Sequence, residues 1–528
     1  MITPTLERPI RYGPSPVTRP SSPVLYFPLA FFFVYLNFTV VLFAFGPWRY
    51  PVADGRALYG FLMLAHFALA AGYLSARWNV PGTSFSRAAV SRLVTLCLVV
   101  TLVLIVPTSL LDTGRPIPNV ITGVLHPGVA YARSLELRSE RAFIYVSYIR
   151  IVLGPFLFLL FPLLVTYWQD VTNRIRIVGS IAVAAGATIS IAEGVNKGLA
   201  DLLALFAILA LTAYFSRKLR LSRIRWIAVA VGWLVASGLF VAYFGATQAT
   251  RAGSASAYGS LPAAAASPSS VAPPSPMASP GMPTPSPTAT PRPTATPSPT
   301  ATPSPTATPS PTATPSPAAT PGPASYPGGV QAIKVDYGHP LLRVLPKSLR
   351  TTAVGATSYL TQGYFALYLS LKEPFVPMFG VGNSFFLTQQ AVRITGNNQI
   401  AGMSYPSRIQ KYGWDALGRW SSIYPWIASD VSFPGAIVVV FLIGRFFAIA
   451  WFDALSSRNP FAFGMVALFA IMLFYFPANN QTTQFGEGFT AFWGILAAWL
   501  LTRNGLIFAF SRKIRLKWAG LARGASSR

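Results

Sequence analysis

Long runs of apolar residues alternate with short polar segments along most of this chain. Eight runs are long enough to cross a hydrocarbon layer about 30 Å thick as helices, and the last two are short and would need tilt or snorkelling to do so. Seven precede and three follow one long polar interval, from about Gly245 to Asp430. The predicted spans are Leu25–Phe45, Leu58–Leu74, Val90–Leu111, Phe143–Tyr167, Ile175–Ala192, Leu199–Phe215, Trp226–Phe244, Phe433–Phe452, Phe461–Phe476 and Phe489–Leu501.

The long interval has two parts of different composition. The first repeats TATPSP and related hexamers, which cannot bury apolar area and predict a disordered linker. A spacer is its simplest role, and an O-glycosylated stalk or a wall-penetrating arm are alternatives. The second part predicts an ordered loop with interfacial helices. The predicted segments are a cytoplasmic N-terminus 1–24, a seven-helix region 25–245, the linker 246–330, the ordered loop 331–430, a three-helix region 431–506 and a basic tail 507–528.

The overall composition is that of a membrane protein. Hydrophobic residues make up 52% and charged residues 10% of the 528 residues, whereas soluble domains average roughly 25% charged residues. We therefore expect an all-α polytopic membrane protein of about ten transmembrane helices, seven plus three, with one large extracytoplasmic loop. No cleavable signal pattern precedes the first span, so this helix is expected to remain.

The net charge of +27 is a common property of nucleic-acid-binding proteins, but here the basic residues follow the predicted topology. With the amino terminus inside, 21 Lys and Arg residues lie in the inside segments and 7 lie in the short outside loops. This bias satisfies the positive-inside rule. It predicts that both termini are cytoplasmic and that the long interval is outside, and it gives no reason to expect a nucleic-acid partner.

Several kinds of chemistry are missing from the sequence. Cys97 is the only cysteine, so neither an intrachain disulfide nor a thiolate metal site can form. The motifs GxxxxGK(S/T), HExxH and strand-bounded GxGxxG are also absent. Nucleotide hydrolysis and zinc hydrolysis are therefore not expected, and we expect no cofactor and no metal.

The ordered loop carries two stretches with candidate roles. Tyr359–Leu371 is apolar and aromatic but too short and too polar to span, which favours a helix in the membrane interface. Beyond the glycine-rich stretch Met378–Phe386, Arg393, Arg408 and Lys411 are interleaved with tyrosines and tryptophans. This pattern fits an aromatic anchoring belt or a surface that stacks sugars and binds phosphate. The sequence leaves both open.

Charged residues gather at the outer ends of the fifth and sixth spans. Glu193, Lys197 and Asp201 are spaced four residues apart and share one face if the chain there is helical. Gly194 and Gly198 favour instead a tight turn that clusters the three charges. Ionisable groups at membrane depth often mark a functional site, and the alternative is a self-neutralising hairpin tip at the water interface.

The stretch that enters the fourth span contains both signs of charge, and its charged residues are Arg133, Glu136, Arg138, Glu140, Arg141 and Arg150. Mixed charge at helical spacing is typical of a solvated amphipathic helix. Several guanidinium groups on the outer face would also suit a diphosphate, because the planar fork binds phosphate oxygens in pairs.

Four further residues each allow two interpretations. Asp430 and Glu487, at the outer ends of the eighth and tenth spans, are candidate bases or helix terminators. Arg445, inside the eighth span, snorkels inward or faces a water-filled cavity. His339 is the only histidine of the long interval, and a structural role is its simplest one.

With these features the chain resembles the Wzy-type O-antigen and oligosaccharide repeat-unit polymerases, which are multi-span proteins of bacterial inner membranes with a large outer loop late in the chain. The resemblance rests on ELRSERAFIYVSYIR, GVNKGLAD, SYLTQGYFALYLSL followed by FGVGNSFF, and IASDVSFPGAIVVVFLIGRF. Lys197 stands where that family more often has an arginine, and Phe433 is displaced from the family pattern. The family does not require residues 251–330.

The resemblance implies that a polyprenyl-diphosphate-linked oligosaccharide donates its glycan to a sugar hydroxyl of a second lipid-linked unit, on the outer face of a bacterial plasma membrane. Basic side chains would neutralise the leaving diphosphate, and a carboxylate would deprotonate the acceptor hydroxyl. The implied partners are the lipid-linked oligosaccharides, the bilayer, and flippase and chain-length regulator proteins. By position, the candidate diphosphate ligands are Arg138, Arg141, Lys197, Arg393 and Arg408, and the candidate bases are Glu193, Asp430 and Glu487.

Three other functions stay open. A lipid-linked glycan ligase has a similar fold and usually depends on an outer-loop histidine, so a variant of His339 would identify it. A transporter predicts an internal repeat and charges at the bilayer midplane, which the seven-plus-three division does not show. A wall-anchoring structural protein would depend on the linker, and deletion of residues 262–325 would distinguish it from an enzyme.

Overall fold

The computed structural model describes residues 19–79, 84–139, 143–258, 333–414, 420–456 and 458–504. The chain divides into two compact units, and all of these residues belong to the unit that comprises residues 1–258 and 325–528. Most of the predicted N-terminal segment, linker and basic tail lie outside the described residues.

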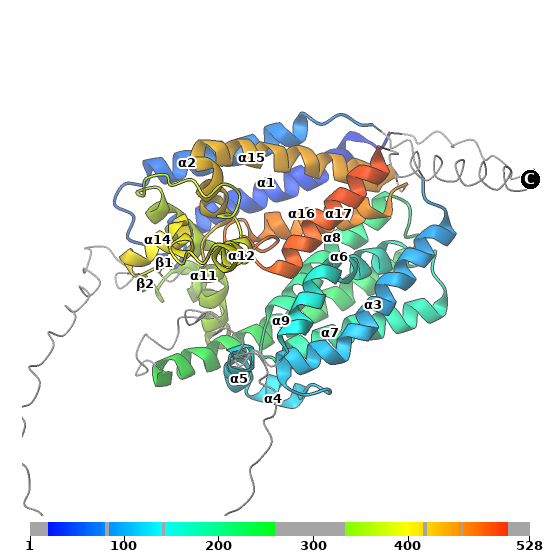
Figure 1. Cartoon of the computed structure of the whole chain (residues 1–528), viewed down its shortest axis with the longest axis horizontal. Helices are drawn as coiled ribbons and strands as arrows, with labels where there is room; N and C mark the ends of the chain where they lie inside the picture. The colour runs from blue at the N-terminus through cyan, green and yellow to red at the C-terminus, as the bar shows by residue number, and fades with distance from the viewer. Residues whose placement is uncertain are drawn as a thin grey trace, which may run out of the picture. The chain divides into compact units, whose positions relative to one another are not determined.

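Long helices make up most of the unit, and short helices and one two-stranded ladder connect them (Figure 1). The long helices are α1 (Ser22–Phe45), α2 (Arg56–Leu74), α3 (Arg87–Thr113), α6 (Ile144–Thr166), α7 (Asn173–Ala192), α8 (Lys197–Phe215), α9 (Arg223–Tyr258), α11 (Lys347–Ser370), α15 (Ile423–Ser456), α16 (Pro460–Tyr475) and α17 (Gly486–Arg503). The short elements are β1 (Trp48–Arg49), α4 (Val120–Leu125), α5 (Pro127–Ser139), β2 (Lys334–Val335), α10 (Pro340–Arg343), α12 (Phe385–Thr395), α13 (Ile400–Met403), α14 (Tyr405–Arg408) and η3 (Ile409–Tyr412).

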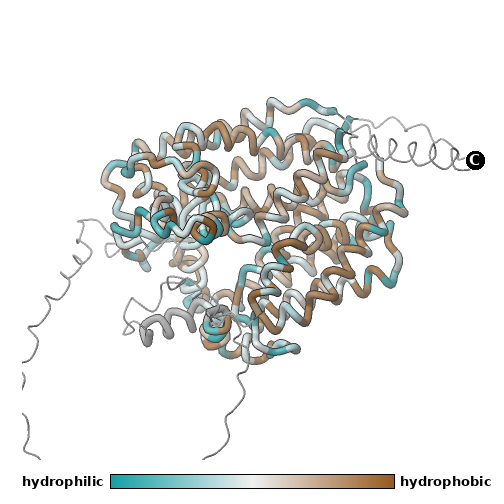
Figure 2. Tube along the Cα trace, viewed as in Figure 1, coloured by the Kyte–Doolittle hydropathy of each residue, from teal (hydrophilic) through white to brown (hydrophobic). Residues whose placement is uncertain are grey.

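Within the described residues, eight helices are long and apolar enough to cross a membrane, namely α1, α2, α3, α6, α7, α8, α9 and α15. They coincide with eight of the ten predicted spans. The two spans predicted to be shortest are also helical, but α16 has 16 residues and α17, with 18, carries a charge near each end. The described part of the chain is thus mostly helical, with eight long apolar helices that could span a membrane (Figure 2).

The apolar helices differ in what covers them. The residues of α16 are buried around its whole circumference, and α16 packs against α6, α8, α15 and α17. In α9, by contrast, none of the apolar window is buried. A helix that is apolar on all sides needs protein or lipid around it. Protein surrounds α16, whereas α9 presents its apolar residues to the surroundings.

The closest packing joins α2 and α15, and it depends on two glycines. A Cβ atom at Gly72 would lie 1.9 Å from the carbonyl oxygen of Phe441. A Cβ atom at Gly444 would lie 2.1 Å from the carbonyl oxygen of Leu69. Small residues let helix backbones touch in this way, so any side chain at either position would push the two helices apart.

The position of α11 overturns one prediction. Tyr359–Leu371 is largely helical as expected, but residues 364–369 are all buried, and α11 contacts α1, α2, α9 and α15. An interfacial helix needs one face open to lipid, so the interfacial placement is wrong. Its polar groups have partners inside the protein instead, as the hydroxyl of Tyr364 lies 2.9 Å from that of Thr39.

The connections between helices meet at two ends of this unit. At the loop-rich end, defined by the α1–α2, α3–α6, α7–α8 and α16–α17 connections and residues 333–414, β1 pairs antiparallel with β2, and Gly194 packs against the carbonyl group of Pro127. At the basic end, defined by the α2–α3, α6–α7, α8–α9 and α15–α16 connections, the carboxylate of Asp170 pairs with Arg87 and Lys218. The candidate site residues that the structure describes lie at the loop-rich end.

Candidate functional site

A buried acidic residue, Glu373, organises the first group of charges at the loop-rich end. Its side chain is 3% exposed and lies 2.8 Å from Lys411 Nζ and 3.9 Å from Arg408 Nη1. The hydroxyl of Tyr412 donates to Glu373 Oε1 at 2.6 Å. Burial alone would raise the pKa of Glu373, but the hydrogen bonds from Lys411 and Tyr412 and the charge of Arg408 outweigh it, so the pKa lies below its ordinary value of 4.5.

We name this group the Glu373 cluster (Glu373, Tyr405, Arg408, Lys411 and Tyr412). Only part of the guanidinium group of Arg408 has partners in it. Its guanidinium carbon lies 4.6 Å from the centre of the Tyr405 ring. Its Nε and Nη2 atoms are buried and have no hydrogen-bond partner among the described residues. Buried donors without an acceptor are costly. Because two cations face one carboxylate, the cluster has the charge and the free donors to bind an anion.

Asp430 forms a second group, in which every position around the carboxylate is used. Its Oδ1 accepts from the backbone N–H groups of Gly380 and Gly382, each at 2.8 Å. Its Oδ2 accepts from the backbone N–H and the side-chain amide of Asn383, at 2.9 Å and 2.6 Å. A carboxylate has about four acceptor positions. These contacts favour a clamp on the glycine-rich loop over the predicted role as a base.

Strained backbone surrounds this clamp. Ser432, two residues after Asp430, has φ 65° and ψ 171° and marks a kink in α15, and Phe379 has φ 50°. Conformations of this kind cost about 1–3 kcal/mol in residues other than glycine. The four bonds to Asp430 compensate for this strain and fix the loop against the kinked helix.

Glu487 belongs to a third group, in which one arginine joins three helices. Arg150 Nε, from α6, lies 2.9 Å from Glu487 Oε1 of α17, and Arg150 Nη1 lies 3.0 Å from Asp112 Oδ2 of α3. The arginine side chain is 18% exposed. The mixed charges of residues 133–150 predict a solvated segment. Arg150 lies instead inside the helical unit, where a charged residue needs partners.

A small hollow adjoins this arginine network. Its volume is about 70 Å³, the space of about two water molecules. Its lining residues are Asp112, Thr113, Arg115, Asn119, Thr122, Ala130, Arg133, Ser134 and Ala192. The hollow is too small for a sugar, but it brings Arg133 of α5 next to the carboxylate that Arg150 holds.

Of the remaining predicted ligands near α6, the structure describes the side chain of one. Arg393, on α12, is exposed and donates to the hydroxyl of Tyr148. Tyr148 and Arg150 belong to the same turn of α6, so Arg393 and Glu487 converge on this helix. Arg138 lies in α5, but its side chain is outside the described part of the chain, and Arg141 lies outside the described residues altogether.

The Glu193, Lys197 and Asp201 group adopts the turn, not the continuous helix. α7 ends at Ala192, and Gly194 has φ +71°. Lys197 pairs with Asp201 inside α8 at 3.0 Å, and Asp201 also accepts from the hydroxyl of Tyr475 at 2.8 Å. Glu193 is buried at the C-cap of α7. The charge of Lys197 is therefore already balanced, as in a self-neutralising hairpin tip.

The contacts of His339 and Arg445 decide between the two interpretations of each residue. His339 caps α10, since its Nδ1 accepts from the N–H of Leu341 at 3.2 Å and its Nε2 lies 2.8 Å from the carbonyl oxygen of Phe45. Both ring nitrogens are occupied, which favours a structural role. Arg445 Nη1 donates to the carbonyl and hydroxyl oxygens of Ser75, at the end of α2. It therefore reaches towards the basic end, as the snorkelling interpretation expected.

A buried polar loop between α16 and α17 was missed in the sequence. The side-chain amide of Asn480 donates to the carbonyl oxygen of Asn383 at 2.6 Å and links the loop to the Asp430 clamp. The buried side-chain atoms of this loop without a hydrogen-bond partner among the described residues are Asn479 Oδ1, Gln481 Nε2, Thr482 Oγ1 and Gln484 Oε1. This mixture of neutral donors and acceptors suits the binding of hydroxyl groups. A run of polar residues between two short apolar helices was the available signal.

Known proteins provide no match. No family model, no curated protein and no solved structure is similar to this chain. The described residues also contain no group of three or more His, Cys, Asp or Glu side chains that could hold a metal ion. Function therefore has to be inferred from the side chains at the loop-rich end.

Proposed function

We propose that the protein is a membrane glycosyltransferase that polymerises polyprenyl-diphosphate-linked oligosaccharide repeat units into a surface polysaccharide. In this proposal the loop-rich end faces outward from a bacterial plasma membrane, both termini face the cytoplasm, and α16 and α17 complete a set of ten spans. The excess of Lys and Arg at the basic end supports this orientation.

The observation that carries the proposal is the buried guanidinium of Arg408, of which two nitrogens, Nε and Nη2, have no acceptor in the described part of the chain. A leaving diphosphate supplies oxygens in the spacing that a guanidinium binds. Lys411, held by Glu373, would add a second cation. Neutralising charge that develops on the leaving group is how such a site would accelerate glycan transfer without a metal.

The acceptor side of the reaction needs hydroxyl binding and a base. The buried polar loop would bind acceptor hydroxyl groups, and Glu193 and Glu487 remain the candidate bases. The base takes the hydroxyl proton, the acceptor oxygen forms a bond to the anomeric carbon, and the bond to the diphosphate breaks with its electrons on the leaving oxygen. In this scheme Asp430 holds the glycine-rich loop and takes no proton.

A substitution of Arg408 tests the proposal. Membranes that contain Arg408→Ala and are supplied with lipid-linked repeat units should form polymer about 100-fold more slowly, because a positioned charge of this kind is worth about 10²–10³ in rate. Arg445→Ala removes an arginine from the other end and should leave polymer length unchanged. Normal polymer from Arg408→Ala, at wild-type protein level, would contradict the proposal.

A further inference from the structure

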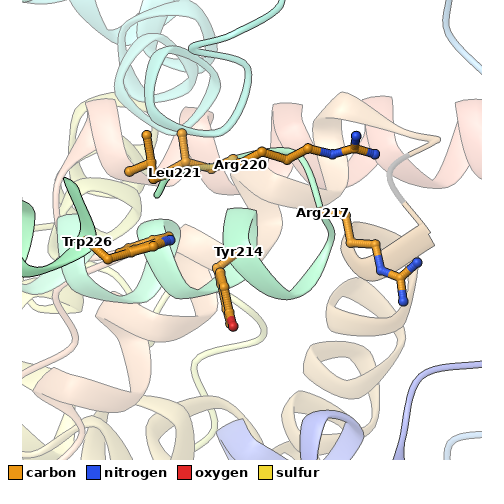
Figure 3. A pocket seen from close by; sticks show the side chains of 6 residues that line it. Tyr214, Arg217, Arg220, Leu221 and Trp226 are labelled. Carbon is orange, nitrogen blue, oxygen red and sulfur yellow. The ribbon is translucent and has the colours of Figure 1, made fainter. Parts of the chain in front are cut away.

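The connection between α8 and α9, at the basic end, contains a larger hollow that the proposed reaction does not use (Figure 3). Its volume is about 410 Å³, and its lining residues are Tyr214, Arg217, Leu219, Arg220, Leu221 and Trp226. In Figure 3 the two guanidinium groups extend to one side, Trp226 lies on the other, and Tyr214 lies between them. The hollow thus has a cationic side and an aromatic side.

Arg217 occupies a backbone position that usually favours glycine. α8 ends at Phe215, the N–H of Arg217 donates to the carbonyl oxygen of Tyr214, and the N–H of Lys218 donates to that of Ala213. This pair of bonds is the Schellman motif, in which the residue after the cap adopts a left-handed conformation. Arg217 does so with φ 57°. Glycine would close the helix with less strain, so helix termination alone does not account for an arginine.

The cations of this connection are only partly neutralised. Residues 217–225 include five Lys and Arg residues. Asp170 pairs with Lys218 at 3.4 Å and also with Arg87 at 3.0 Å. The guanidinium groups of Arg217 and Arg220 make no ion pair or hydrogen bond with the residues that the structure describes. Two cations that have no partner in the described part of the chain therefore border a hollow large enough for a phosphate group.

The aromatic side places this hollow at the level of lipid headgroups. The rings of Tyr214 and Trp226 meet edge to face, with centroids 5.3 Å apart, at the ends of two helices that are apolar enough to span a membrane. Tyrosine and tryptophan at span ends are typical of the membrane–water interface. Clusters of basic residues directly beside a span are typical of binding sites for anionic lipids.

We propose that this hollow binds the headgroup of an anionic phospholipid. The lipid phosphate would lie between Arg217 and Arg220, and its glycerol region would contact Tyr214 and Trp226. The site requires only that the protein lies in a bilayer, so it does not depend on the proposed polymerase activity.

The test uses the full chain in detergent, with phosphatidylglycerol and phosphatidylcholine as probes and native mass spectrometry to count bound lipids. Each basic residue near an anionic surface strengthens binding about fivefold, so the double variant R217G/R220Q should bind phosphatidylglycerol about 30-fold more weakly than the wild type. Because glycine suits the conformation at position 217, the unfolding midpoint should not fall. Phosphatidylcholine binding should be equal in both proteins.

The matched control is R77Q/R92Q, which removes two exposed arginines from the same end, outside the hollow. It should keep wild-type binding of phosphatidylglycerol. Three results would overturn the proposal: unchanged binding by R217G/R220Q, an equal loss in the control, or displacement of phosphatidylglycerol by excess inorganic phosphate, which would make the hollow a site for free phosphate.

Discussion

Two carboxylates in the same part of the chain, Asp430 and Glu373, are used in opposite ways. Asp430 accepts four hydrogen bonds from a neighbouring loop and has no position left. Glu373 holds cations, and one of these, Arg408, keeps buried donors that have no acceptor among the residues that the structure describes. A charge with all its partners stabilises the fold, whereas a buried network with donors to spare is where a ligand is expected.

The largest expected loss of stability follows from removing the carboxylate of Asp430, which clamps the glycine-rich loop. Asp430→Ala removes the acceptor of three backbone N–H groups and one amide, and should lower the free energy of unfolding by about 3–5 kcal/mol. Unfolding in detergent, followed by circular dichroism, measures this loss. Asp336→Ala, which removes an exposed carboxylate paired with Arg49, should leave the midpoint unchanged. A stable Asp430→Ala protein that forms no polymer would restore the role of Asp430 as the base.

A substitution in the Glu373 cluster should lower the free energy of unfolding by less than Asp430→Ala does. Glu373→Gln keeps the shape of the side chain but leaves Lys411 and Arg408 without a buried counter-charge, so the free energy of unfolding should fall by about 2–3 kcal/mol. The double variant Glu373→Gln/Lys411→Met should recover part of this loss, because both partners of one pair are then gone. Losses that simply add would show that the two side chains do not interact.

The response to pH tests the ion pair of Glu373. The pKa of Glu373 is lower in the folded protein than its ordinary value of 4.5, so its contribution to stability is complete above pH 4.5 and is lost as the pH falls through the lowered value. The unfolding midpoints of wild type and Glu373→Gln should therefore differ by a constant amount at neutral pH and converge in acid. A difference that is already lost between pH 7 and pH 5 would contradict this ion pair.

The smallest effect is expected at His339, whose two ring nitrogens are occupied as completely as the oxygens of Asp430. His339→Ala removes a helix cap at an exposed position and should cost about 1 kcal/mol. Polymer formation should persist at normal length. If His339→Ala abolishes glycan transfer while the protein stays folded, a ligase becomes the better assignment.

The positions of most helices could be predicted because lipid and protein core select the same apolar runs. The sequence could not tell which of the two would cover a run. The polar groups that interrupt Tyr359–Leu371 predict a helix in the membrane interface, yet one of them, the hydroxyl of Tyr364, pairs with Thr39, more than three hundred residues away. Burial of this kind depends on tertiary contacts that leave no local pattern.

For the site residues too, the sequence identifies single side chains but not the partners that the fold brings to them. The alternation of cations and aromatic residues points to Arg408, but no spacing rule connects it with its partner Glu373, 35 positions earlier. Arg150 could have been recognised, since an arginine two turns inside an apolar span requires a counter-charge. Asp430 was found, but its four donors come from a glycine-rich loop 47–50 residues earlier, and only the folded chain reveals them.

The two-stranded ladder of β1 and β2 has a practical consequence. Together with the packing of α11 on α9, it holds the chain in place just before and just after residues 259–332. We therefore expect that residues inserted between these two anchored segments would not displace the Glu373 cluster. This stretch is therefore the natural position at which to insert a reporter domain or an affinity tag.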